Sequence, residues 1–352
     1  MKTSPTKPIS KNADSQGEQI ETYVFIEKYY FGTKKNDIFD LSRFFNQGPN
    51  ADINATLYGG LGDDRLDLKG FNQADIFLSF DSTTNHWTLS YAFTDRQWCA
   101  SLNSVERVTF AKNVKLQLSA SQAVLYGTNG NDKLALSPDL TMKASIQAGA
   151  GNDVMSISPR VSRDSSALPT HVINGGSGKD NLLFYGLPSA YAFEIKDAKW
   201  LVRDFNGHAY VSFMNVETAS FSDGTSIRFN PHSYVVKGGN FNLDIGGTDG
   251  ADTFIGTNRD DTFRASAGAD IYDLSKGGND IVYLDLSSYH QGITKITVYG
   301  FSSGDKLLNA ATGESLLGRL VPPDKGFLVG SLKLYNEKAT IDVSFLAAPA
   351  KS

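Results

Sequence analysis

Residues Gly247 to Val282 read GTDGADTFIGTNRDDTFRASAGADIYDLSKGGNDIV and repeat one short unit in tandem. The unit has glycine or another small residue in a turn, an aspartate that closes the turn, and alternating apolar positions after it. Asp252 and Asp270 are eighteen residues apart, which is two such units. Because one unit is too short to bury its own apolar side chains, successive units must stack as coils.

The same unit recurs outside this tandem stretch. GGLGDDRLDL begins at Gly59, GTNGNDKLAL at Gly127, AGAGNDVMSI at Ala148 and GGSGKDNLLF at Gly175. A weaker copy, GTKKNDIFDL, begins at Gly32. Apolar residues at every second position after each turn predict short β-strands with one side chain row pointing into the coil.

The turn composition favours a bound cation. Glycine allows positive φ angles and lets backbone carbonyls crowd toward one point. Calcium takes six to eight oxygen ligands in flexible geometry, and carbonyls and aspartates from two stacked turns can supply them. The candidate metal-ligating residues are Gly247, Asp249, Asp252, Asp261, Gly268, Asp270, Asp280, Asp132, Asp153, Asp180 and Asp63.

The spacing also predicts which aspartates stack. We expect Asp252 to lie over Asp270 and Asp261 over Asp280, each pair one full coil apart. By analogy, the separate copies predict three further pairs. These are Asp132 over Asp153, Asp153 over Asp180, and, as a poorer candidate, Asp37 over Asp63.

An ordinary β-turn is the alternative for each copy, since aspartate in such turns accepts hydrogen bonds from its own backbone. If the turns bind calcium, the stacked carboxylates repel one another without it, and the coils fold only when the ion neutralises them. Lys34, Lys35, Arg259 and Ala265 depart from the glycine-rich pattern, so weaker calcium binding is expected in their turns.

The repeats resemble the glycine-rich nonapeptide repeat of the RTX family, the calcium-binding β-roll proteins of Gram-negative bacteria. The stretch GADIYDLSKGGNDIVYLD, from Gly268, is the nearest match. The resemblance implies Ca²⁺ as the cofactor and export of the unfolded chain by type I secretion, directed by a signal at the extreme C-terminus. It also implies an extracellular location, where millimolar calcium would fold the chain.

A longer duplication organises the rest of the chain. GGLGDDRLDLKGFNQADIF from Gly59 matches GGSGKDNLLFYGLPSAYAF from Gly175. Further on, SVERVTFAKNVKLQL matches NVETASFSDGTSIRF, so Glu106 corresponds to Glu217. We therefore expect an all-β fold, with parallel β-roll or β-helix coils and inserted antiparallel hairpin modules. The expected parts are a disordered tail at 1–19, a first repeat module at 20–120, a second at 121–232, a tandem calcium β-roll at 233–290 and a β-rich C-terminal cap with the secretion signal at 291–352.

Composition excludes several classes of protein. The net charge of −5 and pI of about 5.6, without a basic stripe, argue against nucleic acid as a partner. One cysteine, Cys99, permits no intramolecular disulfide. The chain has no run of about 18 apolar residues, so no transmembrane segment is expected.

Signals for catalysis are weak. The five histidines are isolated, without an H-E-x-x-H motif, and no G-x-S-x-G motif occurs. Cys99 is expected to be a small buried side chain. Arg203, Arg228 and Lys199 could assist a polysaccharide lyase, but no spacing singles them out. We predict no catalytic residues and no organic cofactor, and we favour a protein that is not an enzyme.

The sequence thus predicts a secreted calcium-binding RTX-type β-roll protein without a catalytic domain. It would act extracellularly as a toxin or a host or surface-interaction protein, with calcium and a glycan or host cell surface as partners. The alternative is a carbohydrate-active enzyme, lyase-like or epimerase-like, or a glycan-binding adhesin on a β-helix. The aromatic residues considered for ligand contact, most of them expected in the core, are Tyr29, Tyr30, Phe44, Phe45 and Trp98.

Overall fold

The fold is all-β, as the repeats predict. The regular elements of the described residues are β-strands and short 3-10 helices, without an α-helix. The chain forms two compact units, Met1–Gly178 and Lys179–Ser352, and the finer division expected from the sequence stays a prediction. The tail at 1–19 lies outside the described residues. The computed structural model describes residues 26–40, 53–81, 83–93, 96–136, 142–157, 170–196, 199–204, 208–230, 233–265, 267–289, 292–335 and 339–348.

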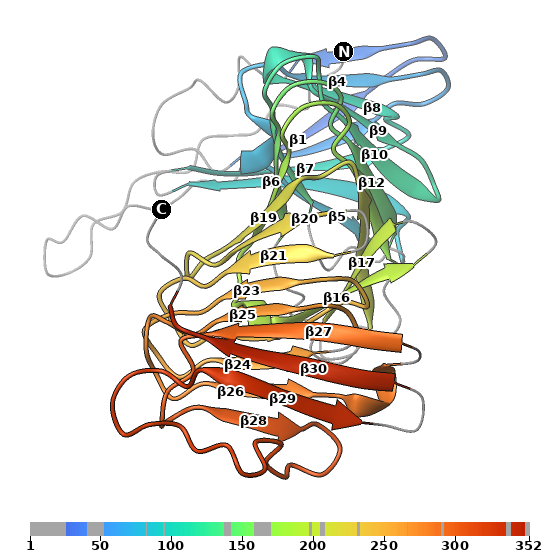
Figure 1. Ribbon diagram of the computed structural model, residues 1–352. Helices are drawn as coiled ribbons and strands as arrows, with labels where there is room; N and C mark the ends of the chain where they lie inside the picture. The colour runs from blue at the N-terminus through green and yellow to red at the C-terminus, as the bar shows by residue number, and fades with distance from the viewer. Residues whose placement is uncertain are drawn as a thin grey trace, which may run out of the picture. The chain divides into compact units, whose positions relative to one another are not determined.

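In the first unit, one sheet joins coil strands to a hairpin module (Figure 1). Strands β1 (Ile26–Phe31), β3 (Ile53–Tyr58) and β7 (Arg96–Asn103) are parallel neighbours. Strands β6 (His86–Phe93) and β5 (Phe77–Asp81) continue the sheet in antiparallel pairing. The predicted combination of parallel coils with an inserted hairpin is therefore confirmed.

A second sheet of this unit carries the strands that follow the turns. Strands β2, β4 and β8 are parallel, β9 is antiparallel to β8 and β10, and β10, β12 and β14 are parallel. A separate parallel pair is β11 with β13. Their bounds are β2 (Ile38–Asp40), β4 (Arg65–Leu68), β8 (Arg107–Phe110), β9 (Lys115–Leu118), β10 (Gln122–Tyr126), β11 (Lys133–Leu136), β12 (Lys143–Gln147), β13 (Val154–Ile157) and β14 (His171–Asn174). The 3-10 helices η1 (Gln73–Asp75) and η2 (Ala111–Asn113) lie between strands.

In the second unit, two sheets enclose the tandem coils. One runs β15-β19-β20-β21-β23-β25-β27-β30-β29, and the other, wholly parallel, runs β22-β24-β26-β28. Strands of the first sheet are β15 (Asn181–Phe184), β19 (Thr218–Phe221), β20 (Ser226–Phe229), β21 (Tyr234–Lys237), β23 (Thr253–Ile255), β25 (Ile271–Asp273), β27 (Gly292–Tyr299), β30 (Ala339–Leu346) and β29 (Gly330–Tyr335). Those of the second are β22 (Asp244–Gly246), β24 (Thr262–Ala265), β26 (Ile281–Leu284) and β28 (Lys306–Asn309).

This unit also contains an inserted antiparallel module. Strands β16 (Tyr191–Lys196), β17 (Lys199–Asp204) and β18 (Ala209–Met214) pair in sequence order. The 3-10 helix η4 (Pro188–Ala190) precedes them, and η5 (Leu286–Ser288) follows β26. The module corresponds to the hairpin expected after the turn at Gly175.

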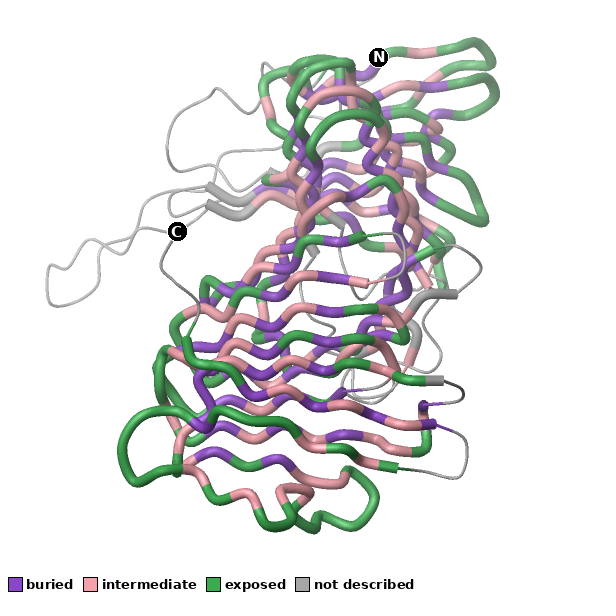
Figure 2. Tube along the Cα trace, in the orientation of Figure 1, coloured by how far each residue is buried: buried purple, intermediate pink, exposed green. Residues whose placement is uncertain are grey.

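The core of the tandem coils is a column of aromatic rings. Phe254, Phe263 and Tyr272 are fully buried, and each is the second residue after the aspartate of its turn. The Phe254 and Tyr272 rings are stacked with centroids 5.1 Å apart, and Phe263, from the opposite sheet, lies 5.3 Å from Phe254. Figure 2 shows the resulting alternation of buried and more exposed residues along the strands. Inward packing of one residue per unit therefore fixes where each aspartate lies.

Candidate calcium turns

The aspartates that close the tandem turns are buried at the corners of the coils. Each comes two residues before an inward core residue, so the same register that buries the core also buries the carboxylate. Asp252, Asp261, Asp270 and Asp280 are all at most 1% exposed. A buried carboxylate must be paired or hydrogen-bonded to be tolerated, so the contacts of its two oxygens decide what the turn can bind.

One oxygen of each carboxylate links neighbouring coils. Asp252 donates its backbone N–H to Oδ1 of Asp270 at 2.9 Å, and Asp261 donates to Oδ1 of Asp280 at 2.8 Å. In the first unit, the Asp132 N–H donates to Oδ1 of Asp153 at 2.8 Å. We call such a row of aspartates a carboxylate ladder. These three pairs have the stacking register that the spacing predicts.

Three ladders in the described part of the chain end in a further carboxylate that sequence analysis did not propose as a site. The Asp280 N–H donates to Oδ1 of Asp305 at 2.8 Å. Asp64 and Asp180 donate to Oε2 of Glu106 and Glu217 at 2.8 and 2.7 Å, respectively. The equivalence of these glutamates in the duplicated segments was visible in the sequence, and it now has a structural reason.

The weak copy at Gly32 stacks on a different residue from the one predicted. Asp37 donates its N–H to Oδ1 of Asp64 at 2.7 Å, and Asp64 is fully buried. The side chain of Asp63 is 52% exposed and forms an ion pair with Arg107 at 2.8 Å. The structure therefore places Asp64, rather than Asp63, at the corner, because Asp64 is two residues before the inward Leu66.

Three other predicted residues shape the turns. Gly268 has φ +120°, and a Cβ there would lie 2.1 Å from the carbonyl oxygen of Gly250. A Cβ on Gly247 would lie 3.0 Å from Oδ2 of Asp252, so this glycine lies against the carboxylate. Asp249 is exposed on the outside of the turn. The expected pair of Asp153 with Asp180 has one member in each compact unit and stays a prediction.

The second carboxylate oxygen, Oδ2, divides the turns into two types. In the threonine-type turn, a threonine four residues before the aspartate donates both its N–H and its hydroxyl to the carboxylate. Thr248 binds Oδ2 of Asp252 in this way, with N···O 2.6 Å and O···O 3.0 Å. The four threonine–aspartate pairs are Thr33–Asp37, Thr128–Asp132, Thr248–Asp252 and Thr257–Asp261.

In the glycine-type turn, no threonine stands four residues before the aspartate, and a glycine with positive φ lies in the turn. Gly60, four residues before Asp64, has φ +97°, and Gly277, three residues before Asp280, has φ +90°. Lys276 holds the threonine position before Asp280, and its Nζ donates to the carbonyl oxygen of Gly256 at 2.7 Å. Oδ2 of Asp64 and of Asp280 is buried in these turns without a hydrogen-bond partner among the described residues. Asp270 is intermediate, since its Oδ2 accepts a hydrogen bond from the Tyr272 hydroxyl at 3.2 Å.

Carbonyl oxygens of one turn face the glycine of the next. A Cβ on Gly62 would lie 2.8 Å from the carbonyl oxygen of Lys35, and one on Gly278 would lie 2.2 Å from that of Arg259. Each glycine-type turn thus brings a buried carboxylate oxygen and close-packed carbonyls to the junction with the turn before it.

Electrostatics at these corners oppose a metal-free, ionised state. Burial and, to a lesser extent, the neighbouring carboxylates of Asp305, Asp261 and Asp260 raise the pKa of Asp280 to about 8. Burial, followed by the charge of Asp252, raises the pKa of Asp270 to about 8. A cation beside these groups would favour their charged form.

The donor set fits calcium. Among the described residues, no three histidine, cysteine, aspartate or glutamate side chains converge on a metal position. An ion at these turns would therefore take most of its ligands from backbone carbonyls, which are hard oxygen donors of the kind that calcium prefers. Asp64 and Asp280 would add one charged oxygen each. The carboxylates of the threonine-type turns already have donors in that position.

Comparison with protein families gives the same assignment. The RTX calcium-binding nonapeptide repeat matches residues 54–72 and 246–282, in four copies. The chain carries RTX calcium-binding repeats. The matched RTX segments contain the turns of Asp64 and Asp280, whereas the RTX-like turn of Asp132, which shows the same ladder contact, lies outside them.

Other comparisons add little. No curated protein sequence matches this RTX-repeat chain. Among solved structures, the extracellular lipase LipA from Serratia marcescens is similar at 13% identity and a TM-score of 0.27, covering 70% of this chain and 42% of the lipase. The chain therefore spans less than half the length of that protein.

Residues considered for other chemistry have structural roles. Arg203 is paired with Glu194 at 2.7 Å. Cys99 is half-buried, and burial raises the pKa of its thiol, which disfavours a reactive thiolate. Trp98 and Tyr30 are buried, and Tyr29 is exposed. Within the described residues, no helix is long and apolar enough to cross a bilayer.

Proposed function

We propose that this RTX-type protein is secreted, folds on binding calcium outside the cell, and acts there as a toxin or a host or surface-interaction protein. One observation carries the calcium-dependent part. The buried Oδ2 atoms of Asp64 and Asp280 have no donor among the residues that the structure describes, and carbonyl oxygens of the preceding turn pack beside their turns. With a single cysteine, Cys99, the chain has no disulfide to stabilise it instead.

Calcium would act as a folding switch. Without it, the coils must either bury ionised carboxylates or protonate them, and both choices weaken the fold. The ion supplies the positive charge that lets the carboxylates of successive turns lie together. Low calcium inside the cell would keep the chain extended for type I export, and millimolar calcium outside would fold it. RTX repeats support this route.

Calcium titration tests the switch. The full chain is purified in EDTA and titrated while the β signal is followed by circular dichroism, with magnesium as the control ion. Magnesium demands a small octahedral site and gives up water reluctantly, so calcium alone should induce the β signal. Equal β signal in EDTA and in calcium would contradict the proposal.

The extracellular role needs its own assay. Fluorescently labelled protein folded in calcium is added to eukaryotic cells and, separately, to liposomes that contain a dye. Saturable binding to cells, or dye release, would support a surface or toxin role. The absence of both would refute it, whatever the calcium titration shows.

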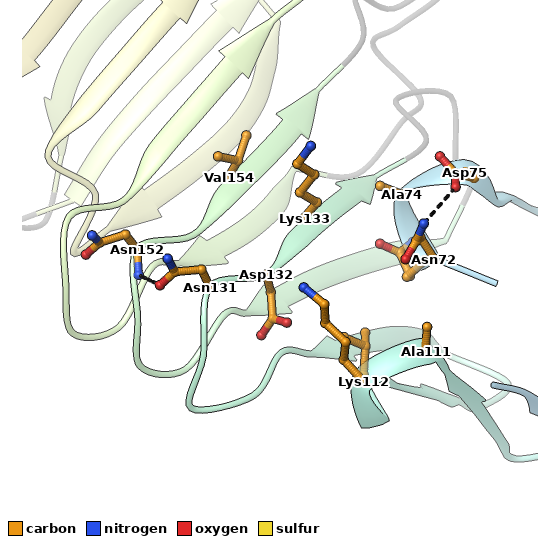
Figure 3. A pocket seen from close by; sticks show the side chains of 12 residues that line it. Asn72, Ala74, Asp75, Ala111, Lys112, Asn131, Asp132, Lys133, Asn152 and Val154 are labelled. Carbon is orange, nitrogen blue, oxygen red and sulfur yellow. Dashed lines mark hydrogen bonds between the residues drawn. The ribbon is translucent and has the colours of Figure 1, made fainter. Parts of the chain in front are cut away.

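A cleft in the first unit favours glycan binding as a second candidate function. Its volume is about 410 Å³, within the usual range of ligand sites. It lies where η1 and η2 meet the turns before β11 and β13, and Figure 3 shows Lys112 reaching toward the turn of Asp132. Its polar lining residues are Asn72, Gln73, Asp75, Lys112, Asn131, Asp132, Lys133 and Asn152.

This cleft has a lysine at a position where the duplicated segment has an aspartate. Lys112 corresponds in sequence to Asp223, which is buried and accepts hydrogen bonds from the N–H and hydroxyl of Thr225. The first module instead exposes Lys112, at φ +57°, to the cleft. Lys133 is a second exposed ammonium there. Two cations among amide groups suit a sugar that carries a carboxylate.

Titration of the calcium-loaded protein with oligogalacturonate and with a neutral oligosaccharide tests this candidate. Binding should be restricted to the acidic sugar and weakened by Lys112→Ala and Lys133→Ala, but not by Lys306→Ala, a control on a strand of the second unit. Equal binding of both sugars, or no binding, would exclude the candidate. Release of an unsaturated, ultraviolet-absorbing product would instead support the lyase alternative.

A further inference from the structure

A threonine-type turn holds the first aspartate of its ladder. Asp37, which is followed by Asp64, and Asp261, which is followed by Asp280, both have the threonine. The same order holds for Thr128 in the ladder from Asp132 and for Thr248 in the ladder from Asp252.

The coil before each of the two tandem ladders has no aspartate at the matching position. Oδ1 of Asp252 accepts from the N–H of Tyr234, and Oδ1 of Asp261 accepts from that of Leu243. Both donors begin or precede a strand without a glycine–aspartate turn of the repeat type. The first turn of each tandem ladder therefore has no repeat-type aspartate turn before it.

The donors at the second carboxylate oxygen distinguish the two turn types. Thr257 points its N–H at Oδ2 of Asp261, with N···O 2.6 Å. In the following turn, Lys276 stands at the threonine position and donates its Nζ to the carbonyl oxygen of Gly256, and Oδ2 of Asp280 receives no donor within the described part of the chain. The threonine hydroxyl and amide thus occupy the side of the carboxylate that the glycine-type turn leaves open.

We propose that threonine-type turns are calcium-free caps that start each ladder, and that calcium occupies only the junctions before glycine-type turns. This inference rests on the proposed calcium-dependent folding and names the turns that carry it. It assigns ion binding to the carboxylates of Asp64 and Asp280 and, by turn sequence, to that of Asp153. It removes the side chains of the four threonine-type aspartates from the ligand set. These are Asp37, Asp132, Asp252 and Asp261.

Counting bound calcium in matched variants of the full chain tests the proposal. Asp280→Asn should bind one calcium ion fewer than the parent in equilibrium dialysis, whereas Asp261→Asn should bind the same number. The pair Asp64→Asn and Asp37→Asn repeats the comparison in the other unit, in case a tandem variant does not fold. Loss of an ion in Asp261→Asn or in Asp37→Asn would overturn the proposal.

A second variant tests the cap itself. Thr257→Val removes the hydroxyl but keeps the N–H, so it should leave the ion count unchanged. Loss of a hydrogen bond to a charged group should raise the calcium midpoint of folding by roughly tenfold. Thr262→Val, on the adjacent strand β24, is the control and should leave the midpoint in place.

These outcomes separate the cap from the function on which it rests. An unchanged midpoint in Thr257→Val, or an ion count that falls in this variant, would overturn the cap. A parent chain that binds no calcium would refute the proposed function itself.

Discussion

Replacement of Asp280 by asparagine should change the free energy of unfolding by different amounts with and without calcium. Asp280 is fully buried, and its pKa is raised to about 8 from the usual value of 3.8. Each pKa unit corresponds to about 1.4 kcal/mol, so holding this carboxylate ionised in the metal-free fold at pH 9 costs at most about 6 kcal/mol. Asparagine keeps the Oδ1 acceptor for the Asp261 N–H and removes the charge. In EDTA the variant should therefore be the more stable protein.

Calcium should reduce this advantage. An ion that binds only the folded chain stabilises it by about 2.7 kcal/mol when its concentration is a hundredfold above the dissociation constant. The variant loses this contribution at the Asp280 junction. At such a calcium concentration its free energy of unfolding relative to the parent should be about 2–3 kcal/mol lower than in EDTA.

Urea unfolding at pH 9, followed by tryptophan fluorescence in EDTA and in calcium, measures both values. Asp285→Asn is the matched control, because Asp285 caps η5 through Ser287 outside the ladder and should change stability equally in both buffers. Destabilisation of Asp280→Asn by the same amount in EDTA and in calcium would refute the reasoning.

Three further outcomes follow from the same contacts. Gly278→Ala should lower the free energy of unfolding in urea by roughly 1–3 kcal/mol, because Gly278 has φ +118° and faces the carbonyl of Arg259. Gly313→Ala, where a Cβ would enter open space, should lower it less, and equal losses would contradict the close approach. Asp270 and Asp280 keep their protons in the metal-free fold up to about pH 8 but lose them near pH 4 when the chain is unfolded. The metal-free protein should therefore become less stable as pH rises from 4 to 8, while its affinity for calcium rises. Constant calcium affinity in titrations from pH 6 to 9 would contradict this. Phe254→Ala should cost about 3–5 kcal/mol in calcium by thermal or urea unfolding, and a smaller loss than an exposed substitution would show that the ring column is not the core.

The sequence predicted the coil register because the repeat length permits only one stacking. Two nonapeptides make one coil, so Asp252 had to meet Asp270. The inserted hairpins were also predictable, since the duplicated segments bracket them. The sequence prediction chose Asp63 where the structure has Asp64, because residue type cannot distinguish two adjacent aspartates. Counting back two residues from the inward Leu66 would have selected Asp64.

The two turn types could not be separated by sequence alone. Threonine and glycine at the second turn position looked like neutral variation within one motif. Their difference lies in the positive φ of Gly60 and in the direction of the threonine N–H. The role of Glu106 was hidden for another reason. Its contact with Asp64 spans 42 residues, across an inserted module whose path no local pattern describes.

The most direct test is anomalous diffraction from crystals grown in millimolar calcium. The account predicts an ion beside the Oδ2 atoms of Asp64 and Asp280, ligated mainly by backbone carbonyls of two successive turns. A well-ordered structure in which both oxygens remain without an ion would contradict it.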